Sequence, residues 1–261
     1  MEGAYRFMEV YLKSLHSFAS VIVVAALAAC GGGSDGNGGT NAGNGGGNGP
    51  NNPPPSTTLL NSTPQVIEYH GDSTIWGYRT GTSGDRIAEA SRAPTAFAAA
   101  LPSHHQVENL GRNSTTACDL LRGGGVYGAE PAQPNWREHM SNSEATVVII
   151  NHGINDVNQG TVGDYRQCLN EVVDIAQAEG KVVILETPNP VADERIEEFV
   201  EAMRDVANSQ GVDLIDQYAH LIADFTANPG EMCPDGVHPT EAVYVEKGRY
   251  AASRFITFVN P

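Results

Sequence analysis

The sequence predicts an α/β domain in which a parallel sheet of about five strands is covered by helices on both faces. Short apolar runs alternate along the chain with stretches of helical periodicity, which is the pattern of βαβ units. Two of the runs, TVVIIN at 146–151 and KVVILE at 181–186, are apolar almost throughout, as in strands buried on both faces. Sites in such sheets lie beyond the carboxyl ends of the strands, so we expect functional residues directly after strands.

The expected elements follow one another in a regular order. Strands are predicted at 65–69, 106–110, 146–151, 181–186 and 212–216, and helices at 93–101, 114–121, 164–180, 193–211 and from 240 to the chain end. Ser and Thr residues are suitable caps for the second helix. Gly180 is the expected C′ residue of the third helix. The fourth helix has acidic residues in its first turn and an apolar face at helical spacing, so it should pack on the sheet.

The first 62 residues are expected to lie outside this domain. In residues 1–29, Arg6 and Lys13 precede the apolar run SFASVIVVAALAA, which is too short to span a bilayer as a helix. The following LAAC resembles a bacterial lipobox, and this implies a lipoprotein signal peptide that leaves Cys30 acylated. An ordinary signal peptide or a buried apolar segment is the alternative, and Met8 is an alternative start.

Residues 30–62 are rich in Gly, Asn and Pro and have little to bury, so they are expected to form a flexible tether before the domain at 63–261. Membrane attachment is expected through the acylated Cys30. In a diderm bacterium, Gly31 would fit sorting to the outer membrane. The protein is therefore expected to be a cell-envelope lipoprotein, on the outer membrane or facing the periplasm.

The net charge of the chain disfavours some classes of binding partner. The formal net charge is −16, and the leader is nearly neutral, so the domain carries the acidity. Strong negative charge argues against nucleic acid as a partner and against direct docking on anionic lipid. A neutral small molecule or an uncharged polysaccharide is a more suitable substrate than a polyanion.

The cysteines suggest a disulfide rather than a metal site. Cys118, Cys168 and Cys233 form no CxxC pair, and their spacings do not suit zinc. No HExxH motif is present, and neither Gly-x-Gly-x-x-Gly match, at 31–36 and 123–128, follows a predicted strand as a dinucleotide fingerprint does, so no metal and no cofactor are expected. An exported chain tolerates disulfides. Cys118 and Cys168 both lie in predicted helices that follow strands, so we expect a bridge between them that leaves Cys233 unpaired.

Polar residues or glycines follow the predicted strands at four points. Ser73 stands in Gly-Asp-Ser after the first strand, and Gly111 stands in NLGRNSTT after the second. Asn155 stands in NHGINDV after the third strand, and Asp235 and His238 stand in CPDGVHPT before the final helix. Each block is weak alone. Together and in this order, they resemble the SGNH, or GDSL-type, family of esterases and lipases from about residue 65 to the chain end.

This resemblance implies a three-layer α/β/α sandwich of flavodoxin-like type and hydrolysis of carboxylic esters by a serine nucleophile. The residue types suit that chemistry. A serine hydroxyl needs a base, and His238 would take the proton of Ser73 and pass it to the leaving alcohol. Asp235, three residues earlier, would hold the imidazole in one tautomer. The one G-x-S-x-G match, at 32–36, lies in the Gly-rich segment and not between a predicted strand and helix, which counts against the α/β-hydrolase fold.

Ester hydrolysis also needs donors for the oxyanion that forms during attack. The resemblance assigns this role to the backbone N–H groups of Ser73 and Gly111 and to the side-chain amide of Asn155. Glycine allows close approach of its N–H, and asparagine offers a neutral donor. Taken singly, the same residues could be a helix cap, a turn glycine and a turn asparagine, and His238 could be a surface residue.

Four residues beside these blocks are candidates for substrate contact: Trp76, Tyr78, Arg112 and His152, although His152 could equally pack beneath its loop. Thr74 stands where the GDSL pattern has Leu, and Gly-Asp-Ser-Thr resembles the carbohydrate-acetylesterase branch of the family. We expect short acyl esters as substrates, with O-acetyl groups of carbohydrate among them. A lysophospholipase or thioesterase is the alternative enzyme, and a non-catalytic binding module on the same fold is the alternative outside enzymes.

Overall fold

A computed structural model of the chain describes residues 63–82, 84–123 and 134–259. The chain divides into two units, Met1–Gly49 and Pro50–Pro261, and all described residues belong to the second. The signal peptide, the tether and the acylated Cys30 that the sequence predicts therefore lie outside the described residues. None of the helices within the described ranges is long and apolar enough to cross a membrane.

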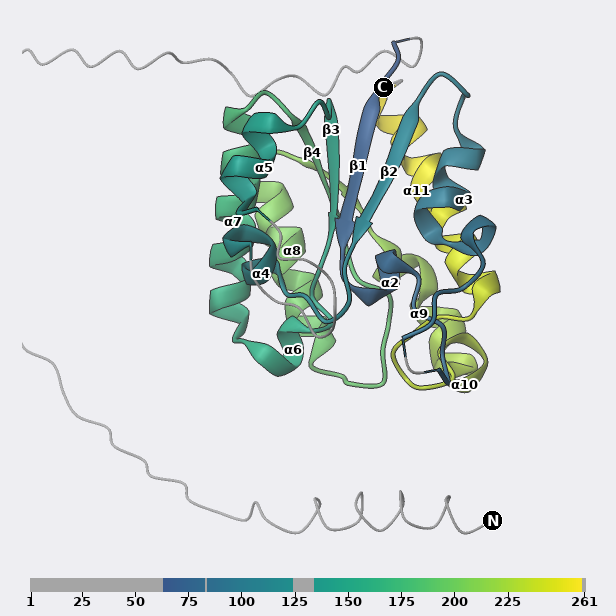
Figure 1. The fold of residues 1–261 in the computed structure, drawn as a ribbon. Coiled ribbons are helices and arrows are strands. Elements are labelled where there is room, and N and C mark those ends of the chain that lie inside the picture. Colours follow the sequence, from purple (N-terminus) through teal and green to yellow (C-terminus); the bar gives the residue numbers. More distant parts are fainter. Residues whose placement is uncertain (1–62, 83, 124–133, 260–261) are drawn as a thin grey trace, which may run out of the picture. The chain divides into compact units, whose positions relative to one another are not determined.

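The second unit is built on a parallel sheet of five strands (Figure 1). The strands are β1 (Val66–Gly71), β2 (Gln106–Gly111), β3 (Val147–Asn151), β4 (Val182–Glu186) and β5 (Asp213–Ile215). They are ordered β2-β1-β3-β4-β5, and every neighbouring pair is parallel. The predicted α/β class with five parallel strands is confirmed. Because the strands are parallel, all their carboxyl ends meet at one edge of the sheet, where α2 lies in Figure 1.

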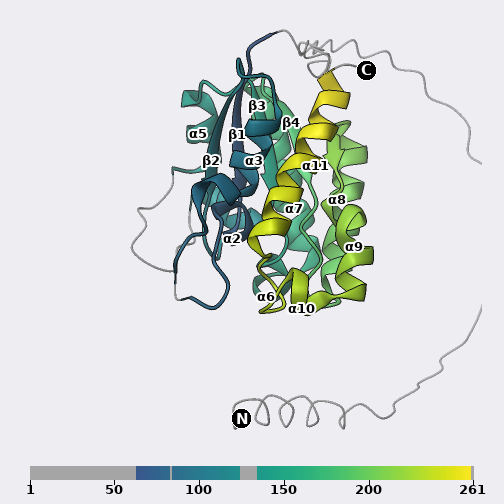
Figure 2. The same ribbon diagram turned by 90° about the vertical axis from the view of Figure 1, so that its right-hand side faces the viewer.

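Helices cover both faces of this sheet. The elements are α2 (Ser73–Trp76), the 3-10 helix η1 (Glu89–Ser91), α3 (Ala93–Ala100), α4 (Ala117–Arg122), α5 (Trp136–Asn142), α6 (Asp156–Gln159), α7 (Val162–Ala178), α8 (Ile196–Gln210), α9 (Gln217–Ala227), α10 (Pro229–Met232) and α11 (Glu241–Val259). Helices α4, α5, α7 and α8 lie on one face, and α3 and α11 lie on the other (Figures 1 and 2). The three layers that the family resemblance implied are therefore present.

The central strands divide the core between these two layers. Val148 and Ile150 of β3 pack with the layer of α4, α5, α7 and α8, whereas Val147 and Ile149 pack with α3 and α11. All four side chains are fully buried, because successive residues of a strand point to opposite faces. Burial of each such side chain stabilises the fold by about 1.5–3 kcal/mol, which explains why the strand is apolar throughout.

Helix boundaries follow local capping. The helix predicted from residue 114 begins at Ala117, because the Thr116 hydroxyl accepts a hydrogen bond from the Asp119 N–H and the Asp119 carboxylate accepts one from the Thr116 N–H. Gly180 takes a positive φ of 74° directly after the C-cap of α7, as expected of a C′ residue. Helices α5 and α9 were not predicted.

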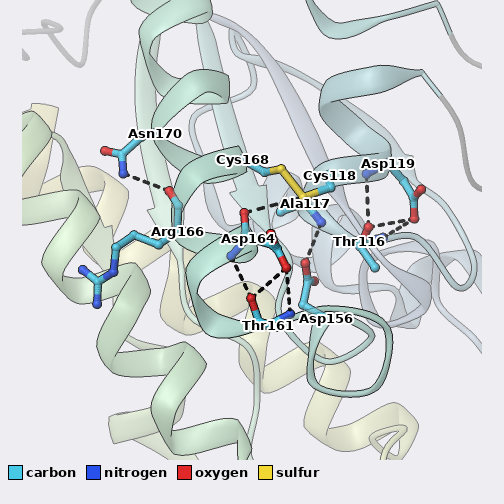
Figure 3. Close-up of a disulfide and its surroundings, with 10 residues drawn as sticks. All are labelled: Thr116, Ala117, Cys118, Asp119, Asp156, Thr161, Asp164, Arg166, Cys168 and Asn170. Atoms are coloured by element: carbon cyan, nitrogen blue, oxygen red, sulfur yellow. Dashed lines mark hydrogen bonds between the residues drawn. A yellow bond between two sulfur atoms is a disulfide. The ribbon is translucent and has the colours of Figure 1, made fainter.

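The expected disulfide is present. A disulfide between Cys118 and Cys168 joins α4 to α7 (Figure 3). Cys233 is a buried free thiol. Beside the disulfide, the Ala117 N–H donates to Asp156 Oδ1 over 3.0 Å. The first turn of α4 is therefore fastened both to α7 and to the start of α6, the short helix that follows β3.

Candidate active site

Ser73 lies at the point where β1 passes into a four-residue helix. Asp72 is the N-cap of α2, and its Oδ1 accepts hydrogen bonds from Thr74 N at 2.8 Å and Thr74 Oγ1 at 2.9 Å. Ser73 is the first residue of that helix and is 7% exposed. The cap holds the sharp turn after the strand, so Asp72 braces its own loop, and the serine stands at the carboxyl edge of the sheet.

Two glycines make room for this helix. A Cβ on Gly71 would lie 2.6 Å from the Asn151 carbonyl oxygen, and a Cβ on Gly111 would lie 2.3 Å from the Trp76 backbone nitrogen. Such distances are too short for any side chain. Gly71 and Gly111, which pair in register at the ends of β1 and β2, therefore allow α2 to rest directly on the edge of the sheet.

The expected donor role of Gly111 needs correction. Its N–H donates a hydrogen bond to Asn109 Oδ1 at 3.0 Å, and Asn109 Nδ2 in turn donates to the Ile75 carbonyl at 2.9 Å. This N–H is committed to a structural partner and is not open to a substrate. Gly111 is needed for the close packing of α2, which is the physical reason for a glycine at this position.

A hydrogen-bonded chain joins the serine, the histidine and the aspartate. Ser73 Oγ lies 2.9 Å from His238 Nε2, and His238 Nδ1 lies 2.8 Å from Asp235 Oδ2. The serine and the histidine are 165 positions apart in the chain, whereas the histidine and the aspartate share one turn. These distances are those that proton transfer from a serine hydroxyl to an imidazole requires.

The turn from Asp235 to His238 fixes its own geometry. Asp235 Oδ1 accepts hydrogen bonds from Val237 N at 2.9 Å and His238 N at 2.7 Å, and Gly236 has a positive φ of 81°. Burial opposes ionisation, but the hydrogen bonds from the His238 backbone and ring and from Val237 hold the pKa of Asp235 below its usual value. The carboxylate is therefore ionised at neutral pH and can support a positive charge on His238.

Asn155 lies at the N-cap of α6, close to the segment before α4. Its Nδ2 donates to the Thr115 carbonyl at 3.0 Å, and Thr115 Oγ1 donates to the Arg112 carbonyl at 2.9 Å. The neighbouring Ser114 has a φ of 58°, and no other non-glycine residue in the described ranges has a positive φ. Backbone strain of this kind gathers at functional sites, which makes Ser114 a further candidate residue of this site.

Three titratable groups lie beneath this edge of the sheet. Burial lowers the pKa of His152 to about 4 and raises that of Asp156 to about 7, and both residues are near Asp72. His152 is 1% exposed, so it packs beneath its loop and does not line the site. This is the alternative to substrate contact that the sequence left open. Asp156 accepts from Ala117 N and has a structural role there.

The other candidates for substrate contact lie around α2. Trp76 is covered by the Arg86 guanidinium, 4.6 Å from the ring centroid, and its carbonyl accepts from Arg86 Nε at 2.9 Å. The Tyr78 ring lies against His238, with the two ring centroids 4.3 Å apart. Arg112 is half-buried and its N–H donates to the Gly71 carbonyl. Contact of these residues with substrate stays a prediction.

One cluster in the described part of the chain has side chains close enough to share a metal ion. Glu68 and His70 of β1 meet His139 of α5, with all ligand atoms within 4.8 Å of one another. Glu68 Oε2 lies 3.0 Å from His70 Nε2 and 2.8 Å from His139 Nε2, and Ser143 Oγ donates to Glu68 Oε1. These donors satisfy the carboxylate without a metal, so the cluster is a hydrogen-bonded brace between β1 and α5.

A buried lysine supports the turn that carries the histidine. Lys247 of α11 is fully buried, and its Nζ donates to Asn189 Oδ1 at 2.9 Å. Asn189 Nδ2 donates to the Val237 carbonyl at 3.3 Å, one residue before His238. Burial lowers the pKa of Lys247, and burial raises the pKa of the nearby Glu186 to about 7. This support was not predictable, because a buried lysine has no signal in a single sequence.

The fold and the site together define a class of protein: ester hydrolases of the α/β type with a serine, a histidine and an aspartate at one edge of a parallel sheet. Residues 69–245, more than half of the chain, match the model of the GDSL-like Lipase/Acylhydrolase family. The chain belongs to this family and is a carboxylic ester hydrolase. No curated protein matches the chain.

Solved structures of esterases share the fold. A carbohydrate acetylesterase family member from Sinorhizobium meliloti is 19% identical with a TM-score of 0.60, and the match covers 76% of this chain and 100% of that chain. The aryl esterase of M. smegmatis is 18% identical, with a TM-score of 0.57 and coverage of 74% and 99%. A variant of an acetyl-xylooligosaccharide esterase from a Geobacillus is 18% identical, with a TM-score of 0.59 and coverage of 78% and 97%.

Proposed function

We propose that the protein hydrolyses short acyl esters through an acyl-enzyme on Ser73. The observation that carries this proposal is the hydrogen-bonded chain from Ser73 Oγ through His238 to Asp235, with both distances below 3 Å. His238 takes the hydroxyl proton as the oxygen attacks the ester carbonyl, and it then gives that proton to the leaving alcohol. Water activated by the same imidazole releases the acid and restores the serine.

The negative charge on the carbonyl oxygen needs hydrogen-bond donors at the same edge of the sheet. We assign the Ser73 N–H, at the start of α2, and the second Nδ2 hydrogen of Asn155 to this role. Because the Gly111 N–H is committed, the Ser114 N–H is our candidate for a third donor. None of the backbone hydrogen bonds among the described residues is donated by it, and Ser114 adjoins Thr115, the partner of Asn155. Each such donor contributes about 3–4 kcal/mol to the transition state.

The substrate class that we favour is O-acetylated carbohydrate. Two of the structures that share the fold are described as a carbohydrate acetylesterase family member and an acetyl-xylooligosaccharide esterase. The Gly-Asp-Ser-Thr sequence at Ser73 and the negative net charge agree with a neutral sugar ester. Lysophospholipid or thioester hydrolysis is the alternative. We also propose that the enzyme acts in the cell envelope, held by an acylated Cys30, on the basis of the LAAC sequence.

The mechanism is tested with a fluorophosphonate probe and the Ser73→Ala variant. We expect one covalent adduct per chain on Ser73, detected by intact mass and peptide mapping, and loss of p-nitrophenyl acetate hydrolysis in the variant. Ser253→Ala is the matched control, because Ser253 is exposed on α11 and its hydroxyl donates to the Tyr250 carbonyl. Full activity of Ser73→Ala would refute the mechanism, and absence of any adduct would favour a non-catalytic binding module.

The substrate class is tested by comparing acyl chains and alcohols on the same preparation. We expect kcat/KM to fall with acyl length from acetate to octanoate, and we expect acetate release from acetylated xylan. Faster release of fatty acid from lysophosphatidylcholine would instead favour a lysophospholipase, and faster release of thiol from an acyl thioester would favour a thioesterase.

A further inference from the structure

The loop after α2 contacts the histidine from a direction that the serine and the aspartate do not occupy. The Tyr78 ring lies over the His238 imidazole, with centroids 4.3 Å apart and an angle of 30° between the planes. Thr80 Oγ1 donates a hydrogen bond to the His238 carbonyl at 3.1 Å. One short segment therefore touches both the ring and the backbone of this residue.

Tyr78 is itself fixed at three points. Its N–H donates to the Ser73 carbonyl at 3.0 Å, its carbonyl accepts from Tyr244 Oη at 3.1 Å, and its hydroxyl donates to the Thr82 carbonyl. The loop also closes on itself, because Ile87 N donates to the Gly77 carbonyl at 2.9 Å. The tyrosine ring is thus held at a fixed place relative to α2, which carries the nucleophile.

The hydrogen bonds of His238 to Ser73 and Asp235 use the two ring nitrogens, so both act along the plane of the imidazole. They resist movement within this plane but oppose movement along the ring normal only weakly. An aromatic ring against one face supplies that missing restraint. Its negative π face also attracts the imidazolium that forms during the reaction.

We propose that Tyr78 is a positioning residue for His238, holding the imidazole in line between Ser73 and Asp235 and stabilising its cationic form during catalysis. Thr80 holds the backbone of the same histidine. This inference rests on the proposed function of the triad and gives Tyr78 a role other than the predicted contact with substrate. A positioning residue lowers kcat without weakening substrate binding, whereas a substrate-binding residue raises KM.

The structure offers a matched control for this test. Tyr250 of α11 stacks on His220 with centroids 3.9 Å apart, and His220 Nε2 lies 2.9 Å from Glu246 Oε1. This is a second tyrosine, histidine and carboxylate group, outside the candidate site. Tyr78→Leu and Tyr250→Leu therefore remove the same kind of ring contact, one at the triad and one away from it.

Four enzymes are assayed on ethyl acetate and p-nitrophenyl acetate: wild type, Tyr78→Leu, Tyr78→Phe and Tyr250→Leu. Ethanol is a poor leaving group that needs a proton from His238, whereas p-nitrophenolate leaves without one. For Tyr78→Leu we expect kcat on ethyl acetate to fall about ten- to hundred-fold, a smaller fall on p-nitrophenyl acetate, and KM within about two-fold of wild type. Tyr78→Phe keeps the ring and should restore most of kcat, and Tyr250→Leu should resemble wild type.

If Ser73→Ala is inactive, any of three results for Tyr78→Leu would overturn the inference. These are activity equal to that of Tyr250→Leu, a raised KM with unchanged kcat, and equal losses of kcat on both esters that Tyr78→Phe does not rescue. Full activity of Ser73→Ala would instead remove the proposed function itself. Thermal unfolding of each variant separates a failure to fold from a loss of positioning. If Tyr78→Leu does not fold, Thr80→Val tests the same segment, and unchanged kcat on ethyl acetate would count against it.

Discussion

The Asn155 side chain donates a hydrogen bond from Nδ2 to the backbone carbonyl of Thr115 over 3.0 Å. Since a carbonyl only accepts, this contact fixes which end of the amide is the NH₂ group. One hydrogen is used for Thr115, and the second remains for another acceptor. The contact thus joins the loop after β3 to the segment before α4 and keeps an oriented neutral donor at the edge of the sheet where β1 and β3 end.

Replacement of Asn155 by alanine should lower kcat about 10²–10³-fold, because one donor to the developing oxyanion is lost. KM for a short ester should change much less. Asn158→Ala is the control, since Asn158 is an exposed residue of the same short helix. Steady-state kinetics on p-nitrophenyl acetate measure both variants. An Asn155→Ala enzyme within about three-fold of wild-type kcat would exclude this role.

Ser114→Gly should stabilise the protein by about 1 kcal/mol, because a φ of 58° is strained for serine and ordinary for glycine. The backbone N–H is kept, so activity should be unchanged. Urea unfolding measures the free energy of unfolding. Ser141→Gly provides the opposite case: it lies inside α5, where glycine should destabilise by about 0.5–1 kcal/mol. A stability loss at both positions would contradict the assignment of strain to Ser114.

Removal of the disulfide in a Cys118→Ala, Cys168→Ala double variant should lower the free energy of unfolding by about 2–4 kcal/mol, since the bridge closes a loop with a sequence separation of 50. Reductant should lower wild-type stability to a similar level and leave the double variant unaffected. Urea unfolding with and without reductant provides the measurement. The Cys233→Ala variant should lose as much stability in reductant as the wild type does. A wild-type protein that is indifferent to reductant would show that the bridge adds nothing to stability.

Asp156 should make stability depend on pH. Burial raises its pKa from 3.8 to about 7, so the folded state holds this proton more tightly than the unfolded state does. Its contribution to stability is complete below about pH 4 and is lost as the pH rises towards 7. Asp156→Asn cannot ionise and should gain on wild type by up to about 1.4 kcal/mol per pH unit in that window.

The measurement for Asp156 is urea unfolding of both proteins at several values from about pH 4 to about pH 8. Asp224→Asn is the control, because Asp224 is exposed on α9. The difference between Asp156→Asn and wild type should widen with pH and level off above about 7. A difference that does not change with pH would mean that Asp156 titrates alike in both states.

Elements with strong periodicity were predictable from the sequence. The strands β3 and β4 are apolar runs bounded by polar residues, and the buried apolar residues of α8 recur at helical spacing. Helix α5 was missed, because it is short and buries only Trp136 and Met140. Helix α9 had a readable signal in its Asp216 cap and in the spacing of its buried residues, and it could have been predicted.

Some residues of the candidate site were likewise predictable from the sequence, and others were not. Ser73, Asp235 and His238 lie together where the strand order placed them, because parallel strands bring their carboxyl ends to one edge. The partner of the Gly111 N–H is the side chain of Asn109, and such a contact depends on rotamers that a sequence does not specify. The buried charges of Glu68 and Lys247 depend likewise on partners far away in the chain.

The order of the site residues along the chain has a consequence for biosynthesis. Ser73 begins the short helix after β1, the first strand in the described part of the chain, whereas its base lies in the turn before α11, 165 positions later. During translation the nucleophile emerges early but has no proton acceptor until nearly the whole domain has been made. A nascent or truncated chain therefore carries an idle serine, and hydrolytic activity begins only when synthesis and folding are essentially complete.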